Sequence, residues 1–300
     1  MSLSKTISKA FLQLSTLPLE LFFPRKCLYV AGDLHYNYQK GDFFNHNLGD
    51  DLNFPLVSSL SGKHVLPIRY SLLGKYRVRY LVIGSILNHW CSRDAIVWGA
   101  GLIHPLASPI PVPKAIYAVR GPLTRMELLR QGIKSPPVYG DPAILMPRLY
   151  LPSPTECHDI ALIPHVSDIR HPFVVHWQNK GGKLLDIGQY GSWRQFIQEL
   201  RNCKAIISSS LHGLILSDAY GIPARRIKLG DLIGDDFKFN DYYLSYRQHV
   251  PSFFTPQEVA SLSSREIICR ISDSWQPIPQ SMQDTLLENC PFLSSRAVSQ

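Results

Sequence analysis

The sequence predicts an α/β fold with two Rossmann-like domains that face a cleft. Short apolar runs alternate with helical stretches along most of the chain, which is typical of βα units around parallel strands. A proline-rich stretch at 147–154 interrupts this alternation, which then starts again. The predicted domains are therefore residues 1–150, with a surface helix near the start, and residues 151–300, with further helices near the end.

The first half contains a series of predicted strands and one well-marked helix. The strands are expected at Leu28–Ala31, Leu81–Ile83, Ala95–Trp98 and Ala115–Val119, and a further short strand ends at Tyr139. The helix is expected from Pro122 to about Gln131. Proline suits the first turn of a helix, and Gly132 suits the position just past its end.

The second half repeats the pattern. Strands are expected at Asp159–Pro164, Lys183–Ile187, Ala205–Ser208 and Ala224–Leu229. One helix is expected from a Ser192 cap to about Asn202, and another over Leu211–Tyr220, closed by Gly221. In such folds a ligand binds at the carboxyl ends of the strands, so polar residues that follow strands are the candidates for a site.

Composition restricts the partners. The net charge is +8 and the pI about 9.2, but no Lys/Arg block stands out, which argues against a nucleic-acid partner and favours anionic lipids or phosphorylated substrates. No two of the six cysteines form a C-x-x-C pair, so no metal site is predicted, and reduced thiols fit a cytoplasmic protein. Residues 10–23 are amphipathic but too short to span a bilayer, which indicates a surface helix open to peripheral membrane contact.

The strongest local signal is the strand that ends in Ser208, Ser209 and Ser210 and turns directly into a helix with His212 and Gly213 in its first turn. Backbone N–H groups at a helix N-terminus and serine hydroxyls attract phosphate or carboxylate. His212 can transfer a proton or donate to an oxyanion. An ordinary helix cap beside a satisfied core histidine is the alternative.

Two further strand ends carry charge. Arg120 precedes Gly121 and Pro122, and its planar fork suits a carboxylate or phosphate, with a structural ion pair as the alternative. Asp141 follows Gly140 at another strand end. It can accept from a sugar hydroxyl or orient a base, although Gly-Asp-Pro is also a good turn.

Two polar segments could contact substrates. The loop 45–53 contains Asn47, Asp50 and Asn53, whose amides and carboxylate suit a sugar, and the alternative is a capping loop with Asp50 or Asp51 at the helix N-cap. In the segment 234–243, Lys238 could contact phosphate. Tyr242 and Tyr243 of the same segment could pack on a sugar or in the core.

In this order the segments resemble the polysaccharide pyruvyl transferase family, especially its bacterial exopolysaccharide and capsule branch, over roughly residues 28–246. The resemblance is carried by these segments: Asn47-Leu48-Gly49-Asp50-Asp51-Leu52-Asn53, Gly84-Ser85, Trp98-Gly99-Ala100-Gly101, Val119-Arg120-Gly121-Pro122-Leu123-Thr124, Gly140-Asp141-Pro142-Ala143, Ile207-Ser208-Ser209-Ser210-Leu211-His212-Gly213-Leu214, Asp218-Ala219-Tyr220-Gly221-Ile222-Pro223 and Lys238-Phe239. It implies a fold like the GT-B glycosyltransferases. It also implies transfer of pyruvate from phosphoenolpyruvate to two hydroxyls of one sugar, with release of phosphate and with no metal or organic cofactor.

The expected roles follow from the chemistry that the resemblance implies. His212 and Asp141 are the expected catalytic residues. The second domain is expected to be the donor side. The expected donor-binding residues are Arg120, which precedes it in the chain, and Ser208, Ser209, Ser210, Gly213 and Lys238. The first domain is expected to bind a sugar or lipid-linked oligosaccharide acceptor through Asn47, Asp50 and Asn53.

One position departs from the family pattern. Some members carry an arginine directly before Leu-His-Gly, where this chain has Ser210. Other cations would then meet the charge of the donor, with Arg120, Arg225, Arg226 and Lys238 as candidates. A GT-B-like glycosyltransferase that uses a nucleotide-sugar stays open as an alternative, as does a non-catalytic carbohydrate-binding partner in polysaccharide assembly.

Overall fold

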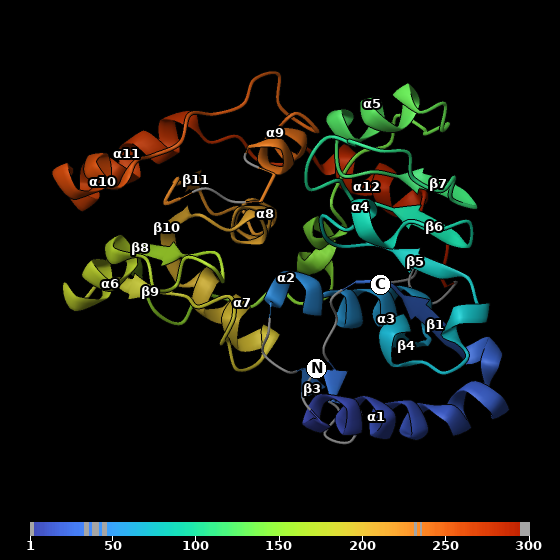
Figure 1. The fold of residues 1–300 in the computed structure, drawn as a ribbon. Helices are drawn as coiled ribbons and strands as arrows, with labels where there is room; N and C mark the ends of the chain where they lie inside the picture. The colour runs from blue at the N-terminus through green and yellow to red at the C-terminus, as the bar shows by residue number, and fades with distance from the viewer. Residues whose placement is uncertain are drawn as a thin grey trace.

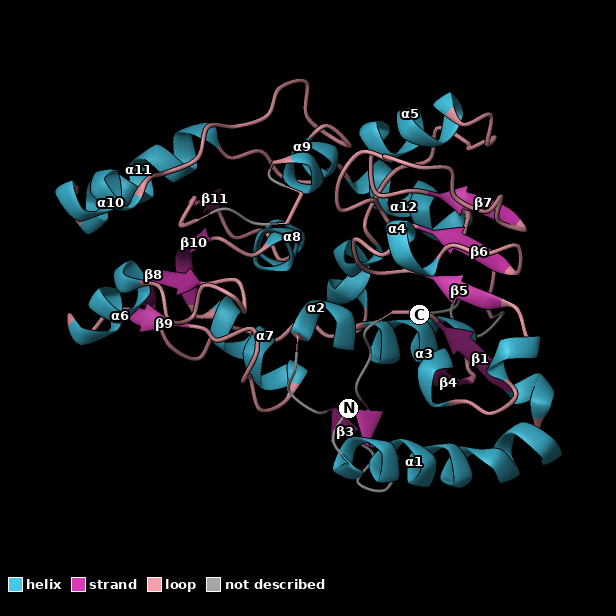
Figure 2. Cartoon of the chain, viewed as in Figure 1, coloured by secondary structure: helices cyan, strands magenta, loops and turns pink. Residues whose placement is uncertain are grey.

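Two parallel sheets organise the chain, with helices between and around them (Figures 1 and 2). The computed structural model describes residues 3–32, 36–37, 42–43, 47–230, 233–234 and 236–294. The α/β class predicted from the sequence is confirmed. The division at residue 150 and the likeness to GT-B enzymes stay predictions.

The first sheet has the strand order β4-β1-β5-β6-β7. Its strands are β1 (Cys27–Val30), β4 (His64–Pro67), β5 (Arg79–Leu81), β6 (Ala95–Trp98) and β7 (Ala115–Ala118). The chain runs outward in both directions from β1 and β5, and such a reversal leaves a crevice at the carboxyl ends where ligands bind. The sequence prediction missed β4, which is short and ends in proline. Proline is tolerated there because β4 lies at the edge of the sheet.

The second sheet has the order β11-β10-β8-β9, and its reversal lies between β8 and β10. Its strands are β8 (His158–Ile163), β9 (Lys183–Leu184), β10 (Cys203–Ser208) and β11 (Ala224–Arg226). β9 and β11 are shorter than predicted. A small antiparallel pair, β2 (Tyr36–Asn37) and β3 (Asp42–Phe43), lies outside both sheets.

The helices predicted at 122–131, 192–202 and 211–220 are confirmed as α5, α7 and α8. The Ser192 hydroxyl caps α7 by accepting from Gln195 N at 3.2 Å. The helices are α1 (Leu3–Phe22), α2 (Leu48–Asp51), α3 (Asn53–Ser61), α4 (Leu87–Trp90), α5 (Pro122–Arg130), α6 (Pro172–Asn179), α7 (Trp193–Arg201), α8 (Leu211–Ala219), α9 (Phe237–Tyr243), α10 (Pro256–Ser261), α11 (Ser264–Ser274) and α12 (Gln280–Glu288), with the 3-10 helices η1 (Pro24–Lys26), η2 (Ile68–Tyr70), η3 (Gly74–Tyr76) and η4 (Pro142–Arg148).

A shared core joins the two sheets. One hydrophobic cluster includes Val30 of the first sheet and Ile206 of the second, together with much of α8 and η4. Late in the chain, α12 returns to the first sheet, where Trp98 Nε1 donates to Leu286 O at 2.9 Å. In Figure 1, α2 and α8 lie between the two sheets, and the strands of both sheets end on the side that faces these helices.

Candidate active site

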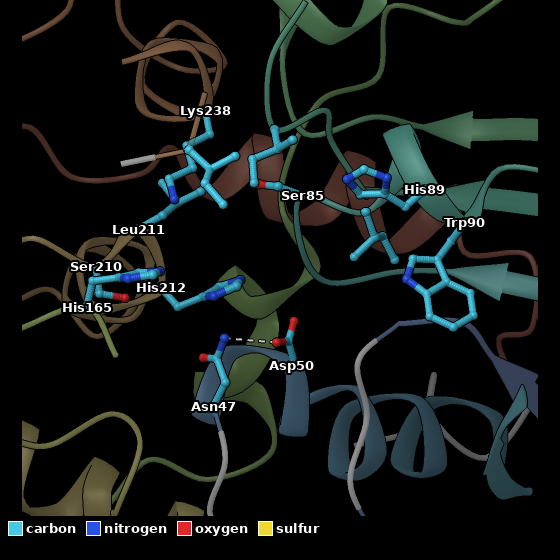
Figure 3. Close-up of a pocket in the computed structure, with 13 residues that line it drawn as sticks. Asn47, Asp50, Ser85, His89, Trp90, His165, Ser210, Leu211, His212 and Lys238 are labelled. Atoms are coloured by element: carbon cyan, nitrogen blue, oxygen red, sulfur yellow. Dashed lines mark hydrogen bonds between the residues drawn. The ribbon is translucent and has the colours of Figure 1, made fainter. Parts of the chain in front are cut away.

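A cavity of about 310 Å³ lies where the carboxyl ends of the two sheets meet (Figure 3). Ser85 follows β5, His165 follows β8, and Ser210 and His212 follow β10, and all four line the cavity. These strands flank the reversal points of their sheets. The cavity therefore occupies the position where open α/β sheets bind their ligands.

His212 and Asp141 form a buried pair at the wall of this cavity. His212 lies in the first turn of α8, and its Nε2 is 3.9 Å from Asp141 Oδ2. Within the described residues neither of these two atoms has a hydrogen-bond partner. The other oxygen, Asp141 Oδ1, accepts from Ala143 N at 3.0 Å and so caps η4.

Burial moves both groups of this pair toward their neutral forms. It lowers the pKa of His212 to about 3, and the nearby charge of Arg120 acts in the same direction. Burial also raises the pKa of Asp141 to about 6. At neutral pH the imidazole is therefore uncharged, with one ring nitrogen able to accept a hydrogen bond, while the carboxylate beside it is largely ionised.

The backbone of α2 fixes the position of the imidazole. A Cβ atom at Gly49 would lie 1.8 Å from His212 Nδ1, so only glycine lets the ring pack this closely. Asn47 caps α2 by accepting from Gly49 N at 3.2 Å. The prediction that Asp50 or Asp51 provides the cap is therefore wrong, because the helix begins earlier. Asn45 and His46 of the same predicted loop lie outside the described residues.

Lys238 brings a cation to the cavity from α9. Its side chain is 6% exposed, and within the described residues no carboxylate lies at ion-pair distance from its ammonium. Burial lowers its pKa to about 8, and the charges of Arg120 and Arg226 act in the same direction. The charges of Asp168 and Asp50 act in the opposite direction from farther away. A buried cation that faces a cavity with no described carboxylate at ion-pair distance is suited to an anionic ligand, because the ligand lowers the cost of the buried charge.

His165 lies at the same cavity and was missed in the sequence prediction. Its Nδ1 lies 2.8 Å from Ser167 Oγ, and burial lowers its pKa to about 4. The available signal was its position two residues after β8, at the carboxyl end of a strand. Near the cavity end that holds Lys238, the structure therefore brings together one ammonium, two uncharged imidazoles and the Ser210 hydroxyl.

Three of the predicted donor-binding residues shape the β10–α8 turn and do not line the cavity. Ser208 Oγ donates to Ile163 O at 2.8 Å, and Ser209 Oγ donates to Asp168 Oδ2 at 2.7 Å. A Cβ atom at Gly213 would lie 2.3 Å from Ser208 Oγ, so glycine allows α8 to start this close to β10. These residues position Ser210 and His212.

Arg120 lies one layer behind the cavity wall. It is fully buried, and its Nε donates to Asp241 Oδ2 at 3.1 Å, an ion pair that joins the segment after β7 to α9. Its Nη1 donates to the Ser85 hydroxyl, which does line the cavity. This geometry matches the structural ion pair considered above. Asp241 carried no sequence signal, because it lies 121 residues away from its partner.

Two of the predicted acceptor-binding residues line the cavity, and the third lies behind them. Asn47 and Asp50 line the cavity, and Asn47 Nδ2 donates to Asp50 Oδ2 at 2.8 Å (Figure 3). Asn53 is buried behind them, and its amide joins α3 to the end of β5 through Ile83 N at 3.0 Å. Trp90 lines the end of the cavity away from Lys238 and was not predicted.

The described residues carry neither a metal-site cluster nor a membrane span. No three His, Cys, Asp or Glu side chains among them gather as metal ligation would require. Within the same ranges, none of the helices combines the length and hydropathy that crossing a bilayer needs.

Comparison with known proteins tests the family resemblance. The fold and cavity define an α/β protein with a candidate active site between two parallel sheets. The model of the family "Polysaccharide pyruvyl transferase" matches residues 96–229. The family resemblance predicted from the sequence is thereby confirmed over these residues. The match spans β6 to just beyond β11 and includes Asp141, His165 and His212, whereas Asn47 and Lys238 lie outside it.

Two proteins show similarity over most of the chain. Succinoglycan biosynthesis protein ExoV of Rhizobium meliloti (strain 1021) is 26% identical over 217 residues, which cover 65% of this chain and 60% of ExoV. Uncharacterized protein L143 of Acanthamoeba polyphaga mimivirus is 27% identical over 206 residues, which cover 65% of this chain and 69% of that protein.

Proposed function

We propose that this protein transfers pyruvate from phosphoenolpyruvate to a sugar of an exopolysaccharide, forming a pyruvate ketal and free phosphate. The family match supports pyruvyl transfer, and the name of ExoV supports a polysaccharide as the product. One observation carries the proposal. A buried Lys238 ammonium with no described carboxylate at ion-pair distance shares a cavity with the uncharged His212 imidazole, and Asp141 lies behind that imidazole at 3.9 Å.

The donor binds at the end of the cavity that holds Lys238. Phosphoenolpyruvate carries a phosphate and a carboxylate, and both need cationic or N–H donors. Ser210 stands where some family members have arginine, and Lys238 supplies the missing charge. Arg226 instead pairs with Asp236 at 2.6 Å, and Arg225 donates to Ser252 O at 3.0 Å. The Ser210 hydroxyl and the N-terminal amides of α8 complete the anion site.

The reaction needs proton transfer and charge stabilisation. Protonation of the methylene carbon of the donor gives an oxocarbenium-like centre, which one sugar hydroxyl attacks. Phosphate then leaves, and a second hydroxyl closes the ketal, so one hydroxyl proton ends on the new methyl group and the other on phosphate. His212 accepts a hydroxyl proton, and Asp141, 3.9 Å away, stabilises the imidazolium that results.

The acceptor sugar occupies the opposite part of the cavity. Asp50 and Asn47 offer a carboxylate and an amide to sugar hydroxyls. Trp90 offers a flat apolar ring and an indole N–H, a combination that suits a sugar ring. Asn53, Arg120, Ser208, Ser209 and Gly213 support the residues in contact with substrate, and Asp141 acts through His212.

The proposal is tested by product analysis. The full chain is incubated with phosphoenolpyruvate and a panel of aryl hexosides that have neighbouring free hydroxyls, and released phosphate and product mass are measured. We expect phosphate release that depends on the sugar, together with a sugar that has gained a pyruvate ketal. Transfer of a hexose from UDP- or GDP-sugars, with no phosphate release from phosphoenolpyruvate, would overturn the proposal in favour of a glycosyltransferase.

A further inference from the structure

One segment of the chain, which includes the edge strand β4, carries several cations and no acid. Residues 52–93 contain six Lys or Arg residues and no Asp or Glu. The part of this segment that holds η2 and η3 packs against α1, where Leu73 N donates to Glu20 Oε2 at 3.3 Å. Glu20 is the one acid of residues 1–32, and it is fully buried. The described surface that these two segments share therefore presents cations without an exposed carboxylate.

Large apolar side chains are exposed at the same place. At the end of α1, Phe22 is 75% exposed and Phe23 50% exposed, and Tyr76 of η3 is 75% exposed. Figure 1 shows α1 and β4 together along the lower edge of the first sheet. We name this surface the basic-aromatic edge, made of Leu21, Phe22, Phe23, Arg25, Lys26, Lys75 and Tyr76.

The cations and the rings of this surface are interleaved. Lys26 Nζ lies 5.2 Å from the centre of the Phe23 ring, and Lys75 Nζ lies 4.8 Å from the centre of the Tyr76 ring. A soluble anion would account for the cations but leave the rings in water. A bilayer that contains anionic lipid satisfies both, since rings enter the headgroup region while Lys and Arg meet the lipid charge.

We propose that the basic-aromatic edge docks the protein on the surface of an anionic phospholipid bilayer. The chain lies on this surface without crossing it, and each cation near the bilayer strengthens partitioning by about fivefold. Charge complementarity selects anionic lipid over neutral lipid. This inference does not depend on the reaction proposed above, because its surface lies outside the cavity and shares no residue with it.

The test is co-sedimentation of the full chain with vesicles of phosphatidylcholine alone and with vesicles that also contain phosphatidylserine. We expect sedimentation with the anionic vesicles and much less with the neutral ones. Reversal of three cations (Arg25→Glu, Lys26→Glu, Lys75→Glu) is expected to lower the partition constant about 100-fold. Removal of three rings (Phe22→Ser, Phe23→Ser, Tyr76→Ser) is expected to abolish the binding that remains at high salt.

A matched control separates the surface from net charge. The triple variant Lys134→Glu, Lys180→Glu, Arg265→Glu changes the charge equally at exposed positions elsewhere, and we expect it to sediment almost like the unaltered chain. Melting temperatures establish that each variant is folded. The proposal is overturned if the unaltered chain ignores anionic vesicles, or if the edge variants and the control variant lose binding equally.

Discussion

Two buried carboxylates, one within α8 and one beside its first turn, differ in how many hydrogen bonds they accept. Asp218, near the end of α8, accepts from Tyr242 and Tyr246 at 2.9 Å each and from Trp275 Nε1 at 2.8 Å. Asp141, near the start of α8, keeps one oxygen without a hydrogen bond within the described residues, 3.9 Å from His212. Burial raises the pKa of each carboxyl to about 6.

A raised pKa therefore does not by itself identify a functional carboxylate. The donors around each group make the distinction. Three donors engage both oxygens of Asp218, which joins α8, α9 and the residue after α11 into one network. Asp141 keeps an open oxygen beside an imidazole that lines a cavity, which is the arrangement of a base and its orienting group.

The largest expected effect concerns His212. His212→Ala is expected to lower turnover about 10²- to 10⁴-fold, because the group that accepts the hydroxyl proton is lost. Steady-state phosphate release at saturating phosphoenolpyruvate measures this. The exposed His176→Ala is the control, with turnover unchanged. Equal turnover in the two variants would mean that the open pair at the cavity is not catalytic.

Removal of the two carboxylates should lower the free energy of unfolding by different amounts. Asp218→Ala strands three buried donors and is expected to lower the free energy of unfolding by roughly 3 kcal/mol or more. Asp141→Ala loses the capping bond from Ala143 N and should cost about 1 kcal/mol. Urea denaturation measures both. A larger loss of unfolding free energy in Asp141→Ala than in Asp218→Ala would contradict the different roles assigned to the two carboxylates.

The pH dependence of stability has a definite sign. The pKa of Asp141 rises from 3.8 in the unfolded chain to about 6 in the folded one, so the folded state binds the proton more tightly. This group favours folding most below pH 4, and the benefit is lost as the pH rises through about 6. Asp141→Asn should therefore reduce the fall in stability between pH 4 and 6, and the part that Asp218 contributes should remain. Urea denaturation at several pH values measures this dependence. A variant whose stability depends on pH as that of the unaltered chain does would contradict the raised pKa.

A smaller effect is expected at the acceptor end. Trp90→Ala should raise the KM for the sugar about tenfold and leave the KM for phosphoenolpyruvate unchanged, because only the sugar contacts this ring. Titration of each substrate at saturating levels of the other separates the two constants. A rise in both would mean that Trp90 shapes the whole cavity.

The sequence predicted the parts of the site that local chain geometry decides. Ser210 and His212 follow a strand directly and open a helix, so a short window was enough to place them at a carboxyl end. Contacts between residues far apart in the sequence could not be predicted. Nothing local could show that Asp241 neutralises Arg120, or that the amide of Asn53 is used by Ile83.

The same limit applies to the fold. The strands predicted near 28, 95 and 115 lie where expected, because each is a short apolar run bounded by turns. The strand β4 escaped prediction because of its proline, and α12 reaches Trp98 across 188 residues. Gly49 looked like a loop glycine, whereas its role is to let the backbone lie against His212.

The central claim is that the cavity binds phosphoenolpyruvate through Lys238, and a thermal shift tests it most directly. A ligand that binds only the folded state adds about 2.7 kcal/mol of stability at a hundredfold excess over its dissociation constant. We expect phosphoenolpyruvate, but not UDP- or GDP-sugars, to raise the melting temperature of the unaltered chain. The shift should fade as the pH rises past about 8, where Lys238 loses its proton. It should disappear in Lys238→Met and persist in Lys228→Met, whose cation lies outside the cavity. An unaltered chain that ignores phosphoenolpyruvate, or a Lys238→Met protein that responds fully, would contradict the account.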